Sequence, residues 1–142
     1  MPKFAANIST MYQELDIPSR FGAAAAHGFT AVEFLNPYPF VIEDLRGWLK
    51  QADLELILIN TRPGLAGEIA FGLAALPGRE QDFQKLFLAA HDYAVGLGAK
   101  MIHVLAGVVQ GLDEADVART LRKNLRWAAE IASGSGIKAM LE

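Results

Sequence analysis

The chain closes with GIKAMLE, residues 136–142, in which an acid follows what we predict to be a buried β-strand. Between the glycine turn and the final Glu142, only Lys138 interrupts the apolar residues. A carboxylate at a frayed chain end would simply be solvated. The alternative is that the chain continues in its relatives, and that Glu142 belongs to a site whose other members are absent from these residues.

Other side chains able to bind or react lie in, or at the ends of, apolar runs. In a barrel of parallel strands, the carboxyl ends of the strands face the site. The candidates for a substrate pocket are therefore Asn7, Phe34, Asn60 and His103. A structural interpretation stays open for the polar ones. Asparagines commonly tie down turn backbone, and a histidine between apolar neighbours is often a hydrogen-bonded core residue rather than a ligand or proton carrier.

Two further charged residues have alternative roles. Glu33 lies inside a predicted strand, where a buried carboxylate is costly unless it is paired or bound to metal. We expect it to form a salt bridge, with Arg62 or Lys100 as the partner. Arg79 opens a long predicted helix, where it either binds an anionic group or locks the preceding loop.

The composition excludes several classes of function. With no cysteine, the 142 residues contain no disulfide, thiolate metal site or thiol nucleophile. A net charge of −3 without a block of like charge offers no footprint for nucleic acid or an anionic membrane. The sequence shows no signal peptide and no bilayer-spanning run, so we expect a cytoplasmic protein. Nucleotide-binding and hydrolase motifs are absent, which leaves oxygen-rich chemistry suited to Mg²⁺ or Mn²⁺.

The elements that must position these residues are indicated by the hydrophobic period, which alternates between β-rich runs and helical stripes. The predicted strands are residues 4–9, 31–35, 54–60, 101–107 and 138–142. Asp16 and Asp113 are placed to begin helices, and Gly28 to follow the end of one. The apolar density of LELILIN, 54–60, indicates burial on both faces of a parallel sheet. The segment 62–79 is an unusually long loop of the kind that carries binding and catalysis.

This alternation predicts an α/β fold of parallel strands joined by right-handed crossovers. Either an open doubly wound sheet or a (β/α)8 barrel satisfies the pattern. A complete barrel needs about 250 residues. As a TIM barrel, residues 1–142 would be a single domain that supplies four βα units and strand 5, or about half a barrel.

Five stretches go beyond a generic pattern: MPKFAANIS at 1–9, GFTAVEFLNPY at 28–38, NTRPG at 60–64, GLAALPGRE at 72–80 and HVLAGVV at 103–109. Together they resemble the hydroxypyruvate isomerase family, within the xylose-isomerase-like barrels. The likeness runs through the whole chain in order, and GLAALPGRE is a specific run rather than a common turn.

The resemblance implies a metal-dependent aldose–ketose isomerisation of a small hydroxy-oxo acid. Hydroxypyruvate interconverts with tartronate semialdehyde through an enediolate, and close relatives act on 2-oxo-tetronates. Two glutamates bind the Mg²⁺ or Mn²⁺ ion and move a proton between adjacent carbons. The first glutamate ends the fifth strand, and MLE at 140–142 matches it. Glu142 is thus the implied catalytic residue and metal ligand, and the other ligands belong to later strands that this chain lacks.

One departure from the family pattern lies in the long loop. Relatives carry an Ala-Gly-Glu shortly before GLAALPG, whereas here AGE occupies 66–68 and IAF intervenes. If this loop covers the substrate, its contacts are rearranged. The substrate is therefore less well determined than the family.

Three functions stay open. The first is an isomerase whose N-terminal half alone is inactive, because it has open sheet edges and an incomplete ligand set. The second is a non-catalytic half-barrel that forms a homo-oligomer or pairs with a partner half-barrel. The third is a 2-oxo-tetronate isomerase, sugar epimerase or inosose-type lyase of the same superfamily, because one fold hosts many sites.

Overall fold

The computed structural model describes residues 2–68 and 70–141, which form a parallel sheet with intervening helices. The strands are β1 (Ala6–Asn7), β2 (Ala31–Glu33), β3 (Glu55–Asn60), β4 (Met101–His103) and β5 (Lys138–Met140). The helices are α1 (Ile17–Ala26), α2 (Ile42–Ala52), α3 (Glu80–Leu97) and α4 (Glu114–Ser133). Every neighbouring pair is parallel and the strand order is β1-β2-β3-β4-β5. The predicted α/β fold of successive βα units is confirmed.

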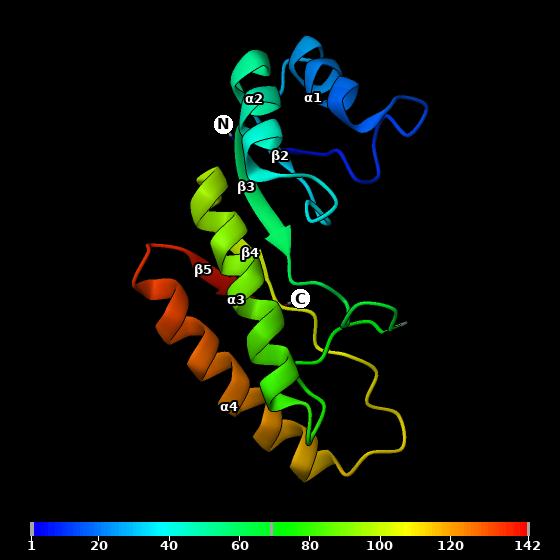
Figure 1. Cartoon of the computed structure of the whole chain (residues 1–142), viewed down its shortest axis with the longest axis vertical. Coiled ribbons are helices and arrows are strands. Elements are labelled where there is room, and N and C mark those ends of the chain that lie inside the picture. The colour runs from blue at the N-terminus through cyan, green and yellow to red at the C-terminus, as the bar shows by residue number, and fades with distance from the viewer. Residues whose placement is uncertain (1, 69, 142) are drawn as a thin grey trace.

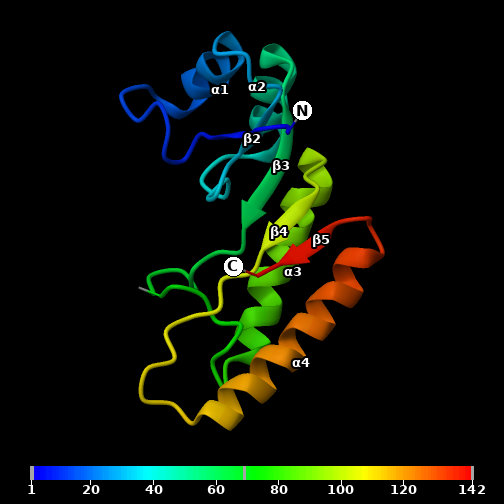
Figure 2. The same ribbon diagram turned by 180° about the vertical axis from the view of Figure 1, so that it is seen from behind.

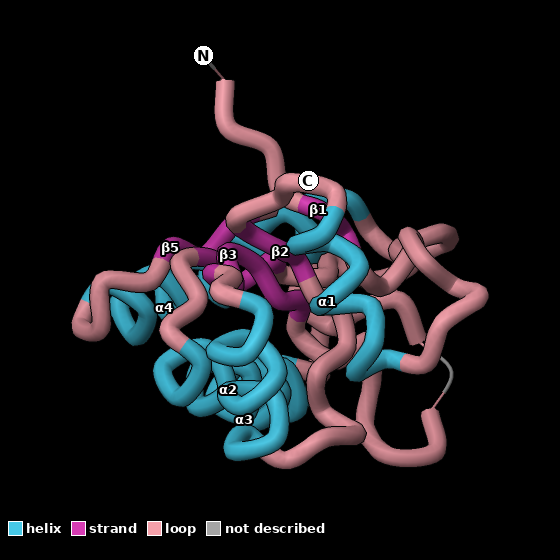
Figure 3. The backbone as a smooth tube through the Cα atoms, turned by 90° about the horizontal axis from the view of Figure 1, so that it is seen from above, coloured by secondary structure: helices cyan, strands magenta, loops and turns pink. Residues whose placement is uncertain are grey.

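The helices pack along one side of the sheet, and the core lies between the two layers (Figures 1 and 3). Seen from behind, β4 and β5 lie in front of α3 (Figure 2). The largest fully buried side chains include Phe21, Phe83 and Phe87 from the helices and Ile59 and Ile102 from the sheet. This is the single-core layering expected when parallel strands alternate with helices. The other face of the sheet is turned away from the helices and carries both apolar and polar side chains, Leu58 and Asn60 among them.

Local side-chain chemistry sets the helix boundaries. The Asp16 carboxylate accepts a hydrogen bond from the Ser19 amide at 3.1 Å, and Asp113 accepts one from the Asp116 amide at 2.9 Å. Both predicted N-caps are confirmed. The hydrogen bonds from Ser19 lower the pKa of Asp16. Gly28 follows the end of α1 with φ +84°, a conformation that costs glycine little.

Several strands are shorter than the sequence predicts. The runs 4–9, 31–35 and 101–107 yield strands of two or three residues. Backbone bonding continues just beyond these limits: the amides of Ile8, Phe34 and Val104 donate to the next strand at 2.8–3.1 Å. Beyond them side chains become the acceptors: the amides of Leu35 and Leu105 donate to the hydroxyls of Ser9 and Thr61.

The closing segment also differs from its prediction as a buried strand. Ile137 is buried, but Lys138 is exposed and Leu141 is 44% exposed. The cause is position, because β5 pairs only with β4 in the described sheet and one flank of the strand stays open. Glu142 lies outside the described residues.

A β-bulge interrupts the pairing of β2 with β3. Val32 lies opposite Leu56, whereas Glu33 lies opposite Leu58, so Ile57 is the extra residue. Leu56 and Ile59 join the core on the helix side, while Leu58 is buried outside that cluster. The predicted burial of this strand on both faces is confirmed.

Candidate functional site

Four polar side chains lie together at the carboxyl ends of adjacent strands. Asn7 is the register partner of Glu33, and Asn60 is the register partner of His103. The Asn7 Nδ2 group donates to Glu33 Oε2 at 3.4 Å, and His103 Nδ1 lies 3.1 Å from Asn60 Oδ1. All four are half-buried. We call this set the polar row. Three of its members, Asn7, Asn60 and His103, are residues that the sequence predicts for the pocket.

His103 contacts Asn60 through one of its two ring nitrogens. An amide oxygen can only accept, so the contact between Nδ1 and Asn60 Oδ1 is a hydrogen bond in the tautomer that carries its proton on Nδ1. In that tautomer Nε2 has the lone pair that can accept a proton or bind a ligand. A hydrogen-bonded His103 can therefore still react, so the two interpretations offered by the sequence are not exclusive.

Asn7 has a structural role as well as a place in the row. Its Oδ1 accepts a hydrogen bond from the Ser9 amide at 3.1 Å, which ties down the start of the following loop. Asn60 differs, because its side chain is directed to His103 rather than to loop backbone. The loop-tying alternative therefore holds for Asn7 and not for the side chain of Asn60.

The expected salt bridge of Glu33 is wrong. Among the described residues Glu33 forms no ion pair, and its partner is the Asn7 amide. Arg62 lies beyond the end of β3, stacked on Tyr38, and Lys100 precedes β4 at the opposite end of the strands. The partner of Glu33 in the polar row is therefore a neutral amide.

Phe34 is not brought into the polar row. It is 3% exposed and packs edge-to-face on Phe21 of α1, with ring centroids 6.1 Å apart. Successive side chains of an extended strand point to opposite faces, so the residue after Glu33 turns toward the helices. Its placement is that of a core aromatic residue.

The long loop 62–79 is tied to the segment that follows β4 and to α4. The Gly72 amide donates to the Pro63 carbonyl at 2.7 Å, and the Ala75 amide donates to the Ala106 carbonyl at 2.8 Å. From α4, Asn124 Nδ2 donates to the Ala74 carbonyl at 2.8 Å, and Asn124 is only 1% exposed. Asn124 was missed in the sequence analysis. Asn124 precedes Ala128 and Ala132 at intervals of four residues, and this helical spacing places it on the buried face of α4.

Arg79 locks the same loop. Its guanidinium holds both oxygens of Glu68, at 2.8 and 3.0 Å, while its Nε donates to Asp82 at 2.8 Å. Hydrogen bonds from Arg79 and the Leu65 amide lower the pKa of Glu68 from 4.5 to about 2. Of the two roles predicted for Arg79, the structure supports the loop-locking one, and AGE at 66–68 supplies the partner.

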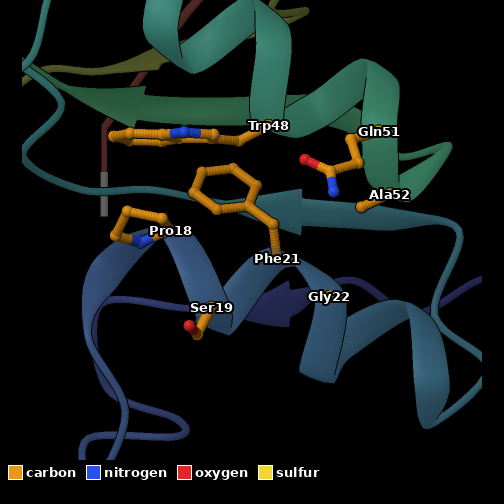
Figure 4. Close-up of a pocket in the computed structure, with 7 residues that line it drawn as sticks. All are labelled: Pro18, Ser19, Phe21, Gly22, Trp48, Gln51 and Ala52. Carbon is orange, nitrogen blue, oxygen red and sulfur yellow. The ribbon is translucent and has the colours of Figure 1, made fainter.

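Two hollows lie near these elements. One, of about 390 Å³, opens between α1 and α2, where Phe21 points toward Trp48 with ring centroids 5.7 Å apart (Figure 4). It lies in the helix layer, and none of its lining residues titrates. The other, of about 370 Å³, lies at the strand ends and includes Tyr38, Arg62 and Glu68 in its lining. The second hollow is linked to the polar row through Tyr38, whose hydroxyl donates to the Asn60 carbonyl.

The described residues do not by themselves complete a metal site. Within 2–68 and 70–141, no three histidine, aspartate or glutamate side chains converge to hold an ion. Glu142, the predicted ligand, lies outside those residues. No described helix is long and apolar enough to cross a membrane.

Parallel βα units with polar side chains at the strand carboxyl ends define a segment of a (β/α) barrel enzyme fold. The sequence matches the family described as Xylose isomerase-like TIM barrel over residues 21–142, and the chain belongs to that family.

Relatives of known name agree with this assignment. The chain is 46% identical over 145 residues to the 2-oxo-tetronate isomerase of Cupriavidus necator, covering 100% of this chain and 55% of that protein. It is 39% identical over 145 residues to the hydroxypyruvate isomerase of Escherichia coli, with the same coverage. The expected resemblance is confirmed. The chain spans about half the length of these curated relatives.

A solved structure shows the same arrangement of elements. The crystal structure of AP endonuclease, family 2 from Brucella melitensis matches with a TM-score of 0.93 at 40% identity. The match covers 99% of this chain and 55% of that chain. The chain therefore has the fold of roughly half of that barrel.

Proposed function

We propose that the protein carrying this chain isomerises a small hydroxy-oxo acid of the hydroxypyruvate or 2-oxo-tetronate type. The observation that carries the proposal is the polar row. It places an available histidine nitrogen at the strand ends of a chain that matches isomerases along its whole length. A 2-oxo-tetronate is favoured over hydroxypyruvate by the higher identity to the enzyme named for it.

The residues of the polar row suit the proton movements of such a reaction. An aldose–ketose exchange moves one proton between adjacent carbons and another between their oxygens. His103 Nε2 would accept the proton of a substrate hydroxyl, while the bond from Nδ1 to Asn60 holds the ring in position. Glu33 and Asn7 would hydrogen-bond to the remaining substrate oxygens.

A divalent cation, Mg²⁺ or Mn²⁺, is part of the proposal, with Glu142 as one ligand and as the catalytic carboxylate. When bound, the cation would polarise the substrate carbonyl. This part rests on the resemblance alone, because the described residues lack a ligand set. For the same reason we propose that the 142-residue chain by itself does not turn over substrate.

A role in binding nucleic acid, which the name of the Brucella melitensis protein would suggest, is not favoured. The chain has a net charge of −3. Proteins that neutralise backbone phosphates need clustered positive charge on the binding surface. The polar row, with a carboxylate at Glu33, has the opposite character.

The test is turnover of both acids by the purified protein carrying this chain, with Mn²⁺ or Mg²⁺ supplied. His103→Gln removes the proton acceptor, and we expect kcat to fall about 10²- to 10⁴-fold. His91→Gln is the matched control, because His91 lies on α3 and bonds to Ser135. No isomerisation of either acid by the wild type, or equal rates for His103→Gln and wild type, would contradict the proposal.

A second candidate, a self-associating half-barrel, is favoured by the edges of the sheet. Among the described residues β1 pairs only with β2, and β5 only with β4. Open edges of this kind pair readily with other strands. We propose that the isolated chain forms dimers or joins a partner half-barrel, and sedimentation of the 15.4 kDa chain tests this. A single monomeric species over a wide concentration range would rule it out.

A further inference from the structure

The hollow lined by Tyr38, Arg62 and Glu68 contains a cation with incomplete bonding. It is bordered by the β2–α2 loop, through Asn36 and Tyr38, and by the β3–α3 loop, through Arg62 and Glu68. The guanidinium carbon of Arg62 lies 4.7 Å from the centre of the Tyr38 ring. Arg62 Nε is buried and has no hydrogen-bond partner among the described residues. A buried donor without a partner is unfavourable, so an occupant that accepts this bond would be stabilised.

Tyr38 provides a fixed platform for Arg62. Its ring is buried edge-on against Tyr93 of α3, with centroids 5.1 Å apart, and its hydroxyl donates to the Asn60 carbonyl. Burial raises the pKa of Tyr38 well above its ordinary value, so the phenol stays neutral. A guanidinium held over a neutral aromatic face loses little freedom on binding an anion. The Arg62 side chain is therefore held in place before an anion binds.

The carboxylate in the same hollow is unavailable to Arg62. Both oxygens of Glu68 are held by Arg79, and Glu68 Oε2 also accepts from the Leu65 amide at 3.0 Å. Among the described residues Arg62 forms no ion pair. The planar fork of a guanidinium matches a carboxylate with two parallel hydrogen bonds. A carboxylate would therefore suit the unoccupied donors of Arg62.

We infer that Arg62, stacked on Tyr38, binds the carboxylate of the substrate. The inference rests on the proposed function, because it identifies which residue recognises the acid group of a hydroxy-oxo acid. Asn60 links the two parts of the site: its side chain bonds to His103 and its carbonyl to Tyr38. Arg62 follows two residues later, so its Cα lies at most about 7 Å from that of Asn60. The inferred pose places the acid group at Arg62 and the hydroxyl of the same short acid toward His103.

The test uses an acid that cannot isomerise, so that binding is measured apart from turnover. D-glycerate is a three-carbon hydroxy acid without a ketone or aldehyde group, and glycerol is its uncharged counterpart. Titration calorimetry on the protein carrying this chain should show glycerate bound more tightly than glycerol. Arg62→Gln should weaken glycerate about tenfold to a hundredfold and leave glycerol unchanged.

Two further variants separate recognition from folding. Arg62→Lys keeps the charge but loses the fork, so we expect an intermediate loss of glycerate affinity. Arg122→Gln makes the same substitution on the exposed face of α4 and should bind glycerate as the wild type does. Circular dichroism melts identify any variant that fails to fold. If Arg62→Gln does not fold, the glycerate affinity of Arg62→Lys is compared with that of the wild type instead.

The outcomes distinguish this inference from the proposed function. Arg62-dependent glycerate binding without isomerase turnover would retain the carboxylate site and overturn the isomerase proposal. Turnover with glycerate affinity unchanged in Arg62→Gln would retain the isomerase and overturn the role of Arg62. Absence of glycerate binding by the wild type would also overturn it.

Discussion

Gly72 is the point at which the long loop comes closest to the end of β4. It has φ +112°, and a Cβ built there would lie 2.1 Å from the carbonyl oxygen of Leu105. Its amide also bonds to Pro63, the neighbour of Arg62. Gly78 in the same loop has φ +81° but nothing within 4 Å of its Cβ position. Gly72→Ala and Gly78→Ala therefore form a matched pair of variants that differ in the space available to the new Cβ atom.

The two substitutions should differ clearly in their effect on stability. Gly78→Ala carries only the cost of a left-handed residue, about 1–2 kcal/mol. Gly72→Ala carries backbone strain of about 1–3 kcal/mol and a packing clash of about 1–3 kcal/mol. Its free energy of unfolding should thus fall by about 2–6 kcal/mol. That is a large part of the roughly 5–15 kcal/mol that stabilises a typical domain.

Urea unfolding measures the total change, and hydrogen exchange locates it. The amides of Ala74 and Ala75 donate to the carbonyls of Leu105 and Ala106, so their protection should drop in Gly72→Ala and persist in Gly78→Ala. If the Gly72 loop shifts away from β4, Arg62 moves with it, and glycerate affinity should fall too. Equal destabilisation by the two variants, with equal protection at Ala74 and Ala75, would refute the close approach described above.

Two other predictions concern the anchoring of the same loop. The pKa of Glu68 is depressed from 4.5 to about 2, so its pairing stabilises the loop above pH 4.5 and is lost as the pH falls toward 2. Exchange of the Leu65 amide should speed up across that window, and Glu68→Gln should abolish this pH dependence. Asn124→Ala removes the donor to the Ala74 carbonyl and should lower the free energy of unfolding by about 1–3 kcal/mol in urea titrations. A loss below about 0.5 kcal/mol would mean that the carbonyl finds another partner.

The elements were predictable because their signals are local. Asp16 and Asp113 cap helices through bonds to residues three positions later, and the hydrophobic period follows from burial on one face. Strand length was less predictable, because a strand ends where its neighbour diverges. The pairing that sets the strand end joins residues far apart in the sequence, as Val104 and Met140 are.

The site was predictable in position but not in its pairings. Asn7, Asn60 and His103 follow from the rule that strand carboxyl ends face the site. The partners of Glu33 and Arg62 did not follow, because sequence spacing cannot show that Tyr38 lies beneath Arg62 or that Arg79 occupies Glu68. Asn124 was missed because a polar residue on an amphipathic helix ordinarily faces solvent, although its spacing from Ala128 and Ala132 places it on the buried face.

The bulge at Ile57 separates β3 into two lengths whose side-chain alternation is out of phase. Before the bulge Leu56 faces the helices, and after it Ile59 does. Loss of Ile57 would close the bulge into regular pairing and leave Asn60 opposite His103. Loss of Ile102 from β4, which pairs with β3 and β5 in unbroken register, would instead turn His103 toward the helices. A deletion of one residue at the bulge, or its later re-insertion, would therefore leave the register of the polar row unchanged.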